Sequence, residues 1–465
     1  GRDIVGIQRV IDDGSRTGRK GTNLSQYWWP WMQDECWFSG GCTVPDRSRI
    51  SFGIFGQGVL SLGGDIDVRA GRDIAQLSVS LPVNWQRSGG VSAAVETFGG
   101  GDLQLEAGRD IVSGAIFVAD GDARIRAGND IRAGISAGNG AALGTLFALQ
   151  DARLAVSAGG GVQIGGVFNP SYLFRDFDGR AYGAGSALAV RAERGDISLG
   201  RVSGEFGFGA RSGLSPSYVF VLPASLELAA LDGGIRIDAN GELYPAVRGQ
   251  LELLARGDIR LANGTISGTR FGLIDALPSR LPSAEDPQFG LPIASSFIVA
   301  GATSSIDLHD PSGLHAGDAE PVRIYSTDGS IVSGQGSGLG AMILDLPKPG
   351  LLAAGLDIVD LSLRGQHLYA GDVTRILAGR DIYNTPLAPQ RSVVFIEIGG
   401  PGTLMLQAGR DIGPLTSAND ALALGYLRPV GAQYPGIRTV GNQNNVWLPR
   451  EGASILLAFG TAPGQ

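Results

Sequence analysis

The sequence is poor in the side chains that hold metals and carry acid–base chemistry. It has two cysteines, Cys36 and Cys42, and three histidines in 465 residues. No histidine lies near the cysteines, whereas a structural zinc site needs four such ligands at short spacings. No Ser-His-Asp order and no nucleotide-binding glycine loop stands out. We therefore expect no metal, no cofactor and no catalytic residue, so the chain is not predicted to be an enzyme.

Lysine and net positive charge are also scarce. The only lysines are Lys20 and Lys348, the net charge is −8 and the pI is about 5.1. Because general nucleic-acid binders carry a basic field, we expect no nucleic-acid partner. No apolar run reaches the roughly 18 residues that a membrane-spanning helix needs. The sequence opens inside a repeat, at Gly1, so we expect it to be part of a longer protein.

Glycine is abundant, with 74 residues, yet 43% of the residues are hydrophobic. A glycine-rich but apolar chain without a Gly-X-Y period is neither collagen nor a disordered segment. This composition is typical of many tight turns between short apolar strands.

The glycines belong to a degenerate repeat. Leu103, Leu105 and Ala107 alternate with polar residues and lead into Gly-Arg-Asp-Ile. Gly-x-Asp-Ile recurs at Gly1, Gly71, Gly108, Gly128, Gly355, Gly379 and Gly409, and shortened Gly-Asp-Ile copies begin at Gly64, Gly195 and Gly257. Period-two alternation places Leu, Leu and Ala on one face of a strand. Glycine permits a sharp corner through positive φ, and aspartate can bond local backbone there.

These strand-and-corner units predict an all-β fold, a right-handed parallel β-helix (β-solenoid) with loop excursions. Full copies are spaced 20 residues apart at Gly108 and Gly128, and 37 apart at Gly71 and Gly108. A coil of roughly 20 residues with loops at its corners explains this scatter. We expect about 15 to 20 coils on that basis.

The chain divides into four regions. Residues 1–50 form an irregular Trp/Cys-rich segment, and residues 51–270 carry the clearest β-helix repeats. Residues 271–300 hold four prolines and are predicted to be an extended excursion. Residues 301–465 continue the β-helix with an irregular C-terminal module.

The repeated Ala-Gly-Arg-Asp-Ile unit resembles filamentous haemagglutinin and the related CdiA-type exoproteins of two-partner secretion, the TpsA family. The tail from Gly436 to Gly441, with Asn442, Asn445, Leu448 and Gly452, looks like a C-terminal module of unknown function found in filamentous haemagglutinin-like proteins. The resemblance covers most of residues 51–465.

The resemblance implies export by an outer-membrane two-partner secretion transporter and display at the bacterial cell surface. It implies adhesion, or contact-dependent growth inhibition in which a toxin outside this chain is delivered after a target-cell receptor is bound. The expected function is thus a rigid extracellular shaft with a surface that binds a protein or glycan receptor.

The strongest candidate binding segment is aromatic and lies in the first region. Within twelve residues it holds Tyr27, Trp28, Trp29, Trp31, Trp37 and Phe38. Tryptophan and tyrosine are enriched at binding hot spots, and they also bind sugars or insert at membrane interfaces. The same side chains could instead cap an end of the solenoid, and the sequence leaves these alternatives open.

A disulfide between Cys36 and Cys42 is expected, because a secreted protein permits one and glycines between them allow a tight loop. Arg194-Gly195-Asp196 and Arg256-Gly257-Asp258 resemble integrin-binding tripeptides, but both stand where the corner of the repeat belongs. His309 lies in an alternating stretch, so we expect it and Asp307 to point to solvent.

A second function fits the same fold: a polysaccharide-binding or polysaccharide-cleaving β-helix, such as a lyase, hydrolase or tailspike. Cleavage by hydrolysis needs paired carboxylates roughly 5 to 10 Å apart in a groove. Stacked coils can bring such residues together from distant positions, so only the register of the strands tests this alternative.

Overall fold

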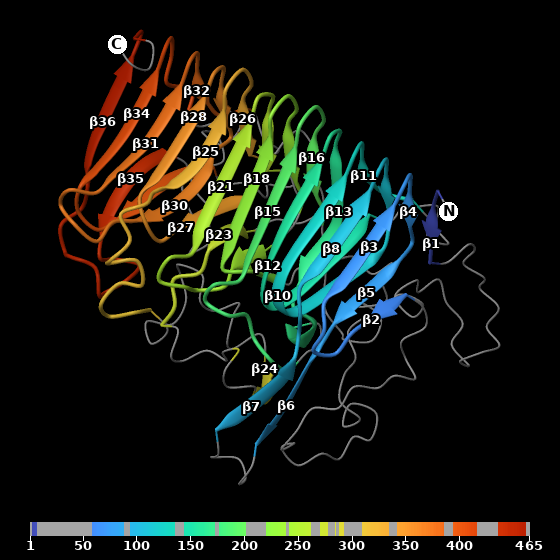
Figure 1. Ribbon diagram of the computed structural model, residues 1–465. Helices are drawn as coiled ribbons and strands as arrows, with labels where there is room; N and C mark the ends of the chain where they lie inside the picture. The colour runs from blue at the N-terminus through green and yellow to red at the C-terminus, as the bar shows by residue number, and fades with distance from the viewer. Residues whose placement is uncertain are drawn as a thin grey trace, which may run out of the picture.

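The structure is a computed structural model. It describes residues 2–6, 58–87, 94–134, 144–172, 176–200, 220–238, 241–261, 270–277, 284, 288–292, 309–333, 342–385, 394–415 and 436–461. Within these ranges nearly all regular structure is β-strand, and the strands pair in parallel between successive coils. In the same ranges no helix has the length and apolar character that crossing a membrane requires. The predicted all-β right-handed parallel β-solenoid is confirmed (Figure 1).

Each coil contributes strands to three faces. The first face is here called the front sheet, and its strands lie side by side across Figure 1. Its strands are β3 (Ile66–Ala70), β8 (Leu103–Ala107), β10 (Ala115–Ala127), β12 (Thr145–Ala158), β15 (Ala187–Ala192), β18 (Ser225–Ala230), β21 (Gln250–Ala255), β25 (Val322–Ser326), β28 (Gly350–Ala354), β31 (Val373–Ala378), β34 (Thr403–Ala408) and β36 (Ser454–Phe459).

The second sheet follows the glycine corner and is made of short strands. They are β1 (Ile4–Val5), β4 (Ile74–Ala75), β9 (Ile111–Val112), β11 (Ile131–Arg132), β13 (Val162–Phe168), β16 (Ile197–Leu199), β19 (Ile235–Ile237), β22 (Ile259–Leu261), β26 (Ile331–Ser333), β29 (Ile358–Val359) and β32 (Ile382–Tyr383).

The third sheet closes the coil. It begins with β2 (Val59–Leu60), β5 (Ser78–Leu81) and the first residues of the long strands β10 and β12. It continues with β17 (Phe220–Leu222), β20 (Gly241–Leu243), β23 (Arg270–Leu273), β27 (Ile343–Leu346), β30 (Ser362–Gln366), β33 (Phe395–Gly399) and β35 (Gly436–Gly441).

Two antiparallel pairs are excursions from this body. Strands β6 (Val83–Arg87) and β7 (Val95–Gly99) form a hairpin that projects from one edge in Figure 1. Strand β14 (Asp176–Gly179) pairs with β24 (Gln288–Pro292), which belongs to the proline-rich region 271–300. Strand β23 of the third sheet begins at Arg270, the last residue of the expected repeat region 51–270.

The front sheet contains twelve strands in the described part of the chain. The expected number of about 15 to 20 coils refers to the whole chain and stays a prediction. At about 4.8 Å per strand, the described stack is roughly 50 Å long.

Alternation builds the core as predicted. Leu103, Leu105 and Ala107 point inward and are at most 2% exposed, while Gln104 between them is exposed. In-register pairing repeats this pattern from β8 to β34, so leucine, isoleucine and alanine form continuous columns along the bore.

The corner glycines are required for close approach rather than for positive φ. A Cβ on Gly128 would lie 2.3 Å from the carbonyl oxygen of Gly108 in the neighbouring coil, and one on Gly379 would lie 2.1 Å from that of Gly355. Neither residue has a φ in the left-handed region. The expectation of positive φ was therefore wrong at these corners: what glycine provides is room for the backbone of the adjacent coil.

Gly128→Ala should lower the stability of the solenoid by about 1–3 kcal/mol, because the new methyl group meets backbone that cannot move aside cheaply. The urea midpoint of unfolding measures this. Gly317→Ala is the matched control, since no atom lies within 4 Å of a Cβ there. Equal midpoints for Gly128→Ala and the unchanged protein would contradict this view of the corner.

Candidate functional site

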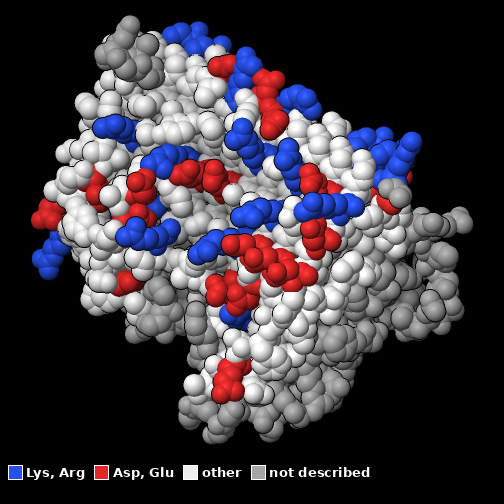
Figure 2. Space-filling view, viewed as in Figure 1, with Lys and Arg blue, Asp and Glu red and all other residues white. Residues whose placement is uncertain are grey.

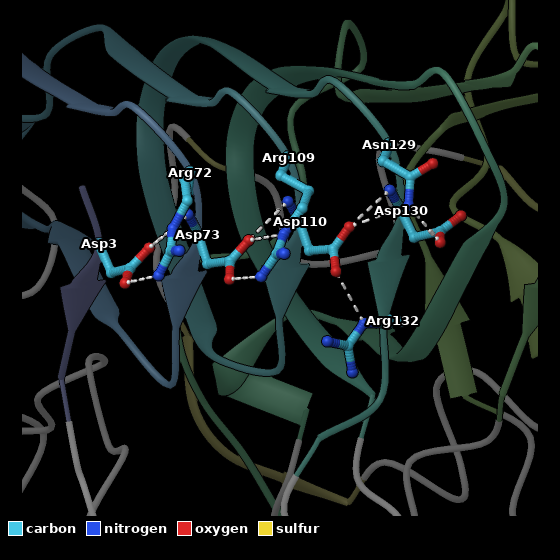
Figure 3. Close-up of polar contacts among 8 residues, drawn as sticks. All are labelled: Asp3, Arg72, Asp73, Arg109, Asp110, Asn129, Asp130 and Arg132. Atoms are coloured by element: carbon cyan, nitrogen blue, oxygen red, sulfur yellow. Dashed lines mark hydrogen bonds and ion pairs between the residues drawn. The ribbon is translucent and has the colours of Figure 1, made fainter.

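The Gly-Arg-Asp corners form a polar ladder along the solenoid (Figure 3). Arg72 donates to Asp3 of the preceding coil, with Nε–Oδ1 at 3.0 Å, and Arg109 donates to Asp73 at 2.8 Å. Asp73 also accepts the backbone N–H of Asp110, and Asp110 accepts that of Asp130. The corner arginines and aspartates thus form a salt-bridged ladder, and these aspartates bond the next coil and not, as expected, their own local backbone.

The ladder neutralises the corner arginines. Arg380 pairs with Asp357 and Arg410 with Asp381 in the same way. The hydrogen bond from Arg72 lowers the pKa of Asp3 to about 2. Because each of these arginines is paired with an aspartate, this edge of the solenoid stabilises the stack of coils and is not a basic surface open to a polyanion.

The two Arg-Gly-Asp tripeptides are corners of this kind. Asp196 accepts the N–H of Gly234 at 2.7 Å, and Asp258 accepts that of Ser330 at 2.8 Å. Arg256 forms ion pairs with Asp232 and Asp328. The repeat accounts for both tripeptides, as the sequence predicted.

The predicted aromatic binding segment lies outside the described residues. This applies to Tyr27, Trp28, Trp29, Trp31, Trp37 and Phe38, and to the predicted Cys36–Cys42 disulfide. All of them stay predictions.

His309 is buried, so the expectation that it faces solvent was wrong. It is 2% exposed, and its Nδ1 lies 2.7 Å from Asp275 Oδ2. Gln366 and Asn445 donate to the same carboxylate oxygen, at 2.7 and 3.2 Å. Asp307 lies outside the described residues. The network ties residues 309–320 to the third face and, within the described ranges, no group of histidine, cysteine and carboxylate side chains is arranged to hold a metal.

A second buried network lies in the same loop. Lys348 is 2% exposed and donates to Asp318 Oδ2 at 2.6 Å and to the Gly249 carbonyl at 2.9 Å. His315 Nδ1 is 3.2 Å from the carbonyl oxygen of Val247. Burial, with a contribution from the charge of Lys348, lowers the pKa of His315 to about 4.

His315 should make the protein less stable in mild acid. Its pKa in the folded chain, about 4, lies below the ordinary 6.5, so the unfolded chain binds the proton first. The stabilisation that the neutral imidazole provides is fully present above pH 6.5. It decreases by about 2–3 kcal/mol as the pH falls to 4. Urea midpoints of the unchanged chain and of His315→Gln between pH 4 and 7 test this. If the urea midpoints of the two proteins change with pH in parallel, the buried neutral imidazole is not the cause of the loss of stability in acid.

A row of charged residues lies on the outward side of the third sheet. Glu242, Asp345, Arg364, Glu397 and Arg438 follow one register line, in which Gly272 of β23 stands between Glu242 and Asp345. The first four are buried, and Arg438 is partly exposed. Arg270 Nε lies 2.7 Å from Asp345 Oδ2 and 3.3 Å from Glu242 Oε1.

Glu242 is the most perturbed carboxyl in this row. Burial raises its pKa to about 8, with Arg270 opposing the shift and Asp345 adding to it. A carboxyl of this kind is a candidate for catalysis in general. Glu242 and Asp345 are 1% and 2% exposed, however, so a polymeric substrate does not reach them. We interpret the row as a structural and pH-sensitive element.

One open candidate site is a trough on the front sheet. It has a volume of about 620 Å³ and crosses six neighbouring strands from β8 to β21. Its floor is made of small side chains from the middle strands, Ala155, Ser157, Ala189 and Ala229. Charged residues surround the floor, namely Glu106, Arg124, Arg126, Arg191 and Glu227. Figure 2 shows basic and acidic side chains interspersed across this face, with uncharged surface between them.

The arginines of the trough differ from those of the corners. Arg124, Arg126 and Arg191 are exposed, and within the ranges described above they form no ion pair. Each of these three side chains points outward from its strand, between residues that point into the core. Their guanidinium groups are therefore available to a ligand.

Two carboxylates meet near one end of the trough. Glu227 and Glu252 are register partners on β18 and β21, so their Cα atoms are about 5 Å apart. Arg323 donates to Glu252 at 2.5 Å and Gln250 at 3.1 Å, while Glu227 is exposed. The sequence could not have identified this pair, because the two residues are separated by a whole coil.

No family model, curated protein or solved structure matches this chain. The fold and the residues described above are therefore the basis for any statement about function.

Proposed function

We propose that this chain is an extracellular segment of a large secreted filamentous surface protein. It provides a rigid shaft and a receptor-binding surface for cell–cell contact, in adhesion or in contact-dependent growth inhibition with the toxin carried outside this chain. Its partners would be an outer-membrane two-partner secretion transporter and a protein or glycan receptor on the target cell.

The observation that carries the proposal is the uninterrupted stack of twelve front-sheet strands in the described part of the chain. Its coils are bonded to one another by ladder aspartates and arginines as well as by the core. A quasi-one-dimensional stack of this kind holds its excursions at fixed positions along a rod. That arrangement suits a spacer that presents binding segments to another cell.

Deletion of residues 24–42 tests the proposal. We expect the variant to keep a β-rich circular dichroism spectrum and to lose binding to target cells, because the aromatic segment is the predicted receptor contact. Deletion of residues 416–434, an equally long segment, is the control and should leave binding intact. Full binding by the 24–42 deletion would overturn the assignment of that segment.

The second candidate is a polysaccharide-binding or polysaccharide-cleaving protein, favoured by the Glu227–Glu252 pair beside the trough. Retaining glycosidases place two carboxyl groups about 5–5.5 Å apart. Release of reducing ends from polysaccharides, abolished by Glu227→Gln and by Glu252→Gln, would establish cleavage. If no reducing ends are released, the pair is not catalytic.

A further inference from the structure

We propose that the trough of the front sheet binds an extended acidic oligosaccharide that carries a carboxylate on every second sugar. This inference rests on the proposed function, since it assigns a ligand class to the shaft of a receptor-binding filament.

The shape of the trough favours a linear chain. It crosses six strands, so it runs along the solenoid axis for about 24 Å. Its alanine and serine floor is flat and mostly apolar, which suits the C–H faces of pyranose rings. Ligand sites commonly combine such an apolar floor with a few fixed polar groups.

The positions of the arginines favour alternate carboxylates. Arg126 on β10 pairs in register with Ser157 on β12, which pairs with Arg191 on β15. Two strand spacings place the two arginines about 10 Å apart. An extended pyranose chain advances by about the same length per sugar as the solenoid does per coil, so every second sugar meets an arginine. Arginine binds carboxylate with two parallel hydrogen bonds.

The remaining charges disfavour a densely anionic ligand. Glu106 and Glu227 lie in the same trough, and the whole chain has a net charge of −8. A polymer with an anion on every sugar would place charge beside these carboxylates. Sparse carboxylates avoid this repulsion.

The pairing of the strands disfavours a peptide. Strands β8, β10, β12, β15 and β18 each have neighbours on both sides. Their backbone groups are therefore used, and a peptide cannot add a strand to this face.

Isothermal titration calorimetry on the full chain tests the inference, with hyaluronan hexasaccharide as the probe because glucuronate occupies alternate sugars. Arg126→Gln and Arg191→Gln should each weaken binding about tenfold, since each removes a charge-assisted contact. Arg375→Gln, an exposed arginine of the same sheet outside the trough, should leave the affinity unchanged. Ala189→Phe should abolish binding by filling the floor without changing charge.

Three comparison ligands define the outcomes that would overturn the inference. Cellohexaose is neutral and should bind at least tenfold more weakly. Equal or tighter binding of hexagalacturonate would contradict the alternate spacing, and equal binding of hexaglutamate would assign the trough to an acidic peptide. If Arg375→Gln weakens binding as much as Arg126→Gln does, the affinity reflects general electrostatic attraction and not a site in the trough. If the chain binds target cells but no oligosaccharide, this inference fails and the proposed function stands.

Discussion

Replacing Glu242 with glutamine should make the protein more stable at pH 9 by about 3–5 kcal/mol and leave its stability at pH 4.5 nearly unchanged. The pKa of Glu242 is about 8 in the folded chain and near 4.5 when unfolded. Between these values the folded chain holds a proton that the unfolded chain has lost. Stability therefore falls as the pH rises through this window, and glutamine removes the dependence because it does not ionise.

Urea unfolding of the two proteins from pH 4.5 to 9 measures the difference directly. Glu227→Gln is the control: the same group is removed from an exposed position on the front sheet, where it should have little effect at any pH. A stability difference between Glu242→Gln and the unchanged protein that stays constant over this range would show that Glu242 is ionised throughout.

Lys348→Met should destabilise the protein by about 3–5 kcal/mol, because it leaves the Asp318 carboxylate buried without its cation. The Asp318 side chain is 6% exposed and lies 2.6 Å from Lys348 Nζ. The pair holds the loop of residues 309–320 against the solenoid, so this loop should also become more sensitive to proteases.

Two variants make this result specific. Adding Asp318→Asn to Lys348→Met should restore much of the stability, because no buried charge then stays unpaired. Arg69→Met breaks the exposed pair with Asp67, whose side chains are 60% and 55% exposed, and should change stability by less than about 1 kcal/mol. Equal losses for Lys348→Met and Arg69→Met would contradict the importance of burial.

The bore and the corners could be predicted because they repeat. Alternation at Leu103, Leu105 and Ala107 specifies a face, and recurrence of the glycine corner specifies a stack. What the repeat does not show is the partner of a corner residue. Asp73 bonds the coil that follows and Gly128 accommodates the backbone of the coil that precedes it, so both roles appear only once register is known.

The buried charges and the trough depend on register even more strongly. Arg270 meets an aspartate 75 residues away, at position 345, because an excursion separates their coils. The sequence did contain a signal for the buried charges. Asp345 and Glu397 are single acidic residues within apolar strands, and apolar runs of this kind are typical of strands buried on both faces. His309 gave no such signal, since its partner Asp275 precedes a long excursion.

The most direct test of the central claim is an equilibrium binding isotherm of the labelled chain on bacterial and host cells. A receptor-binding filament segment predicts saturable binding that unlabelled chain competes away and that the deletion of residues 24–42 removes. Binding that rises linearly with concentration on every cell type, with no competition, would contradict the proposed function.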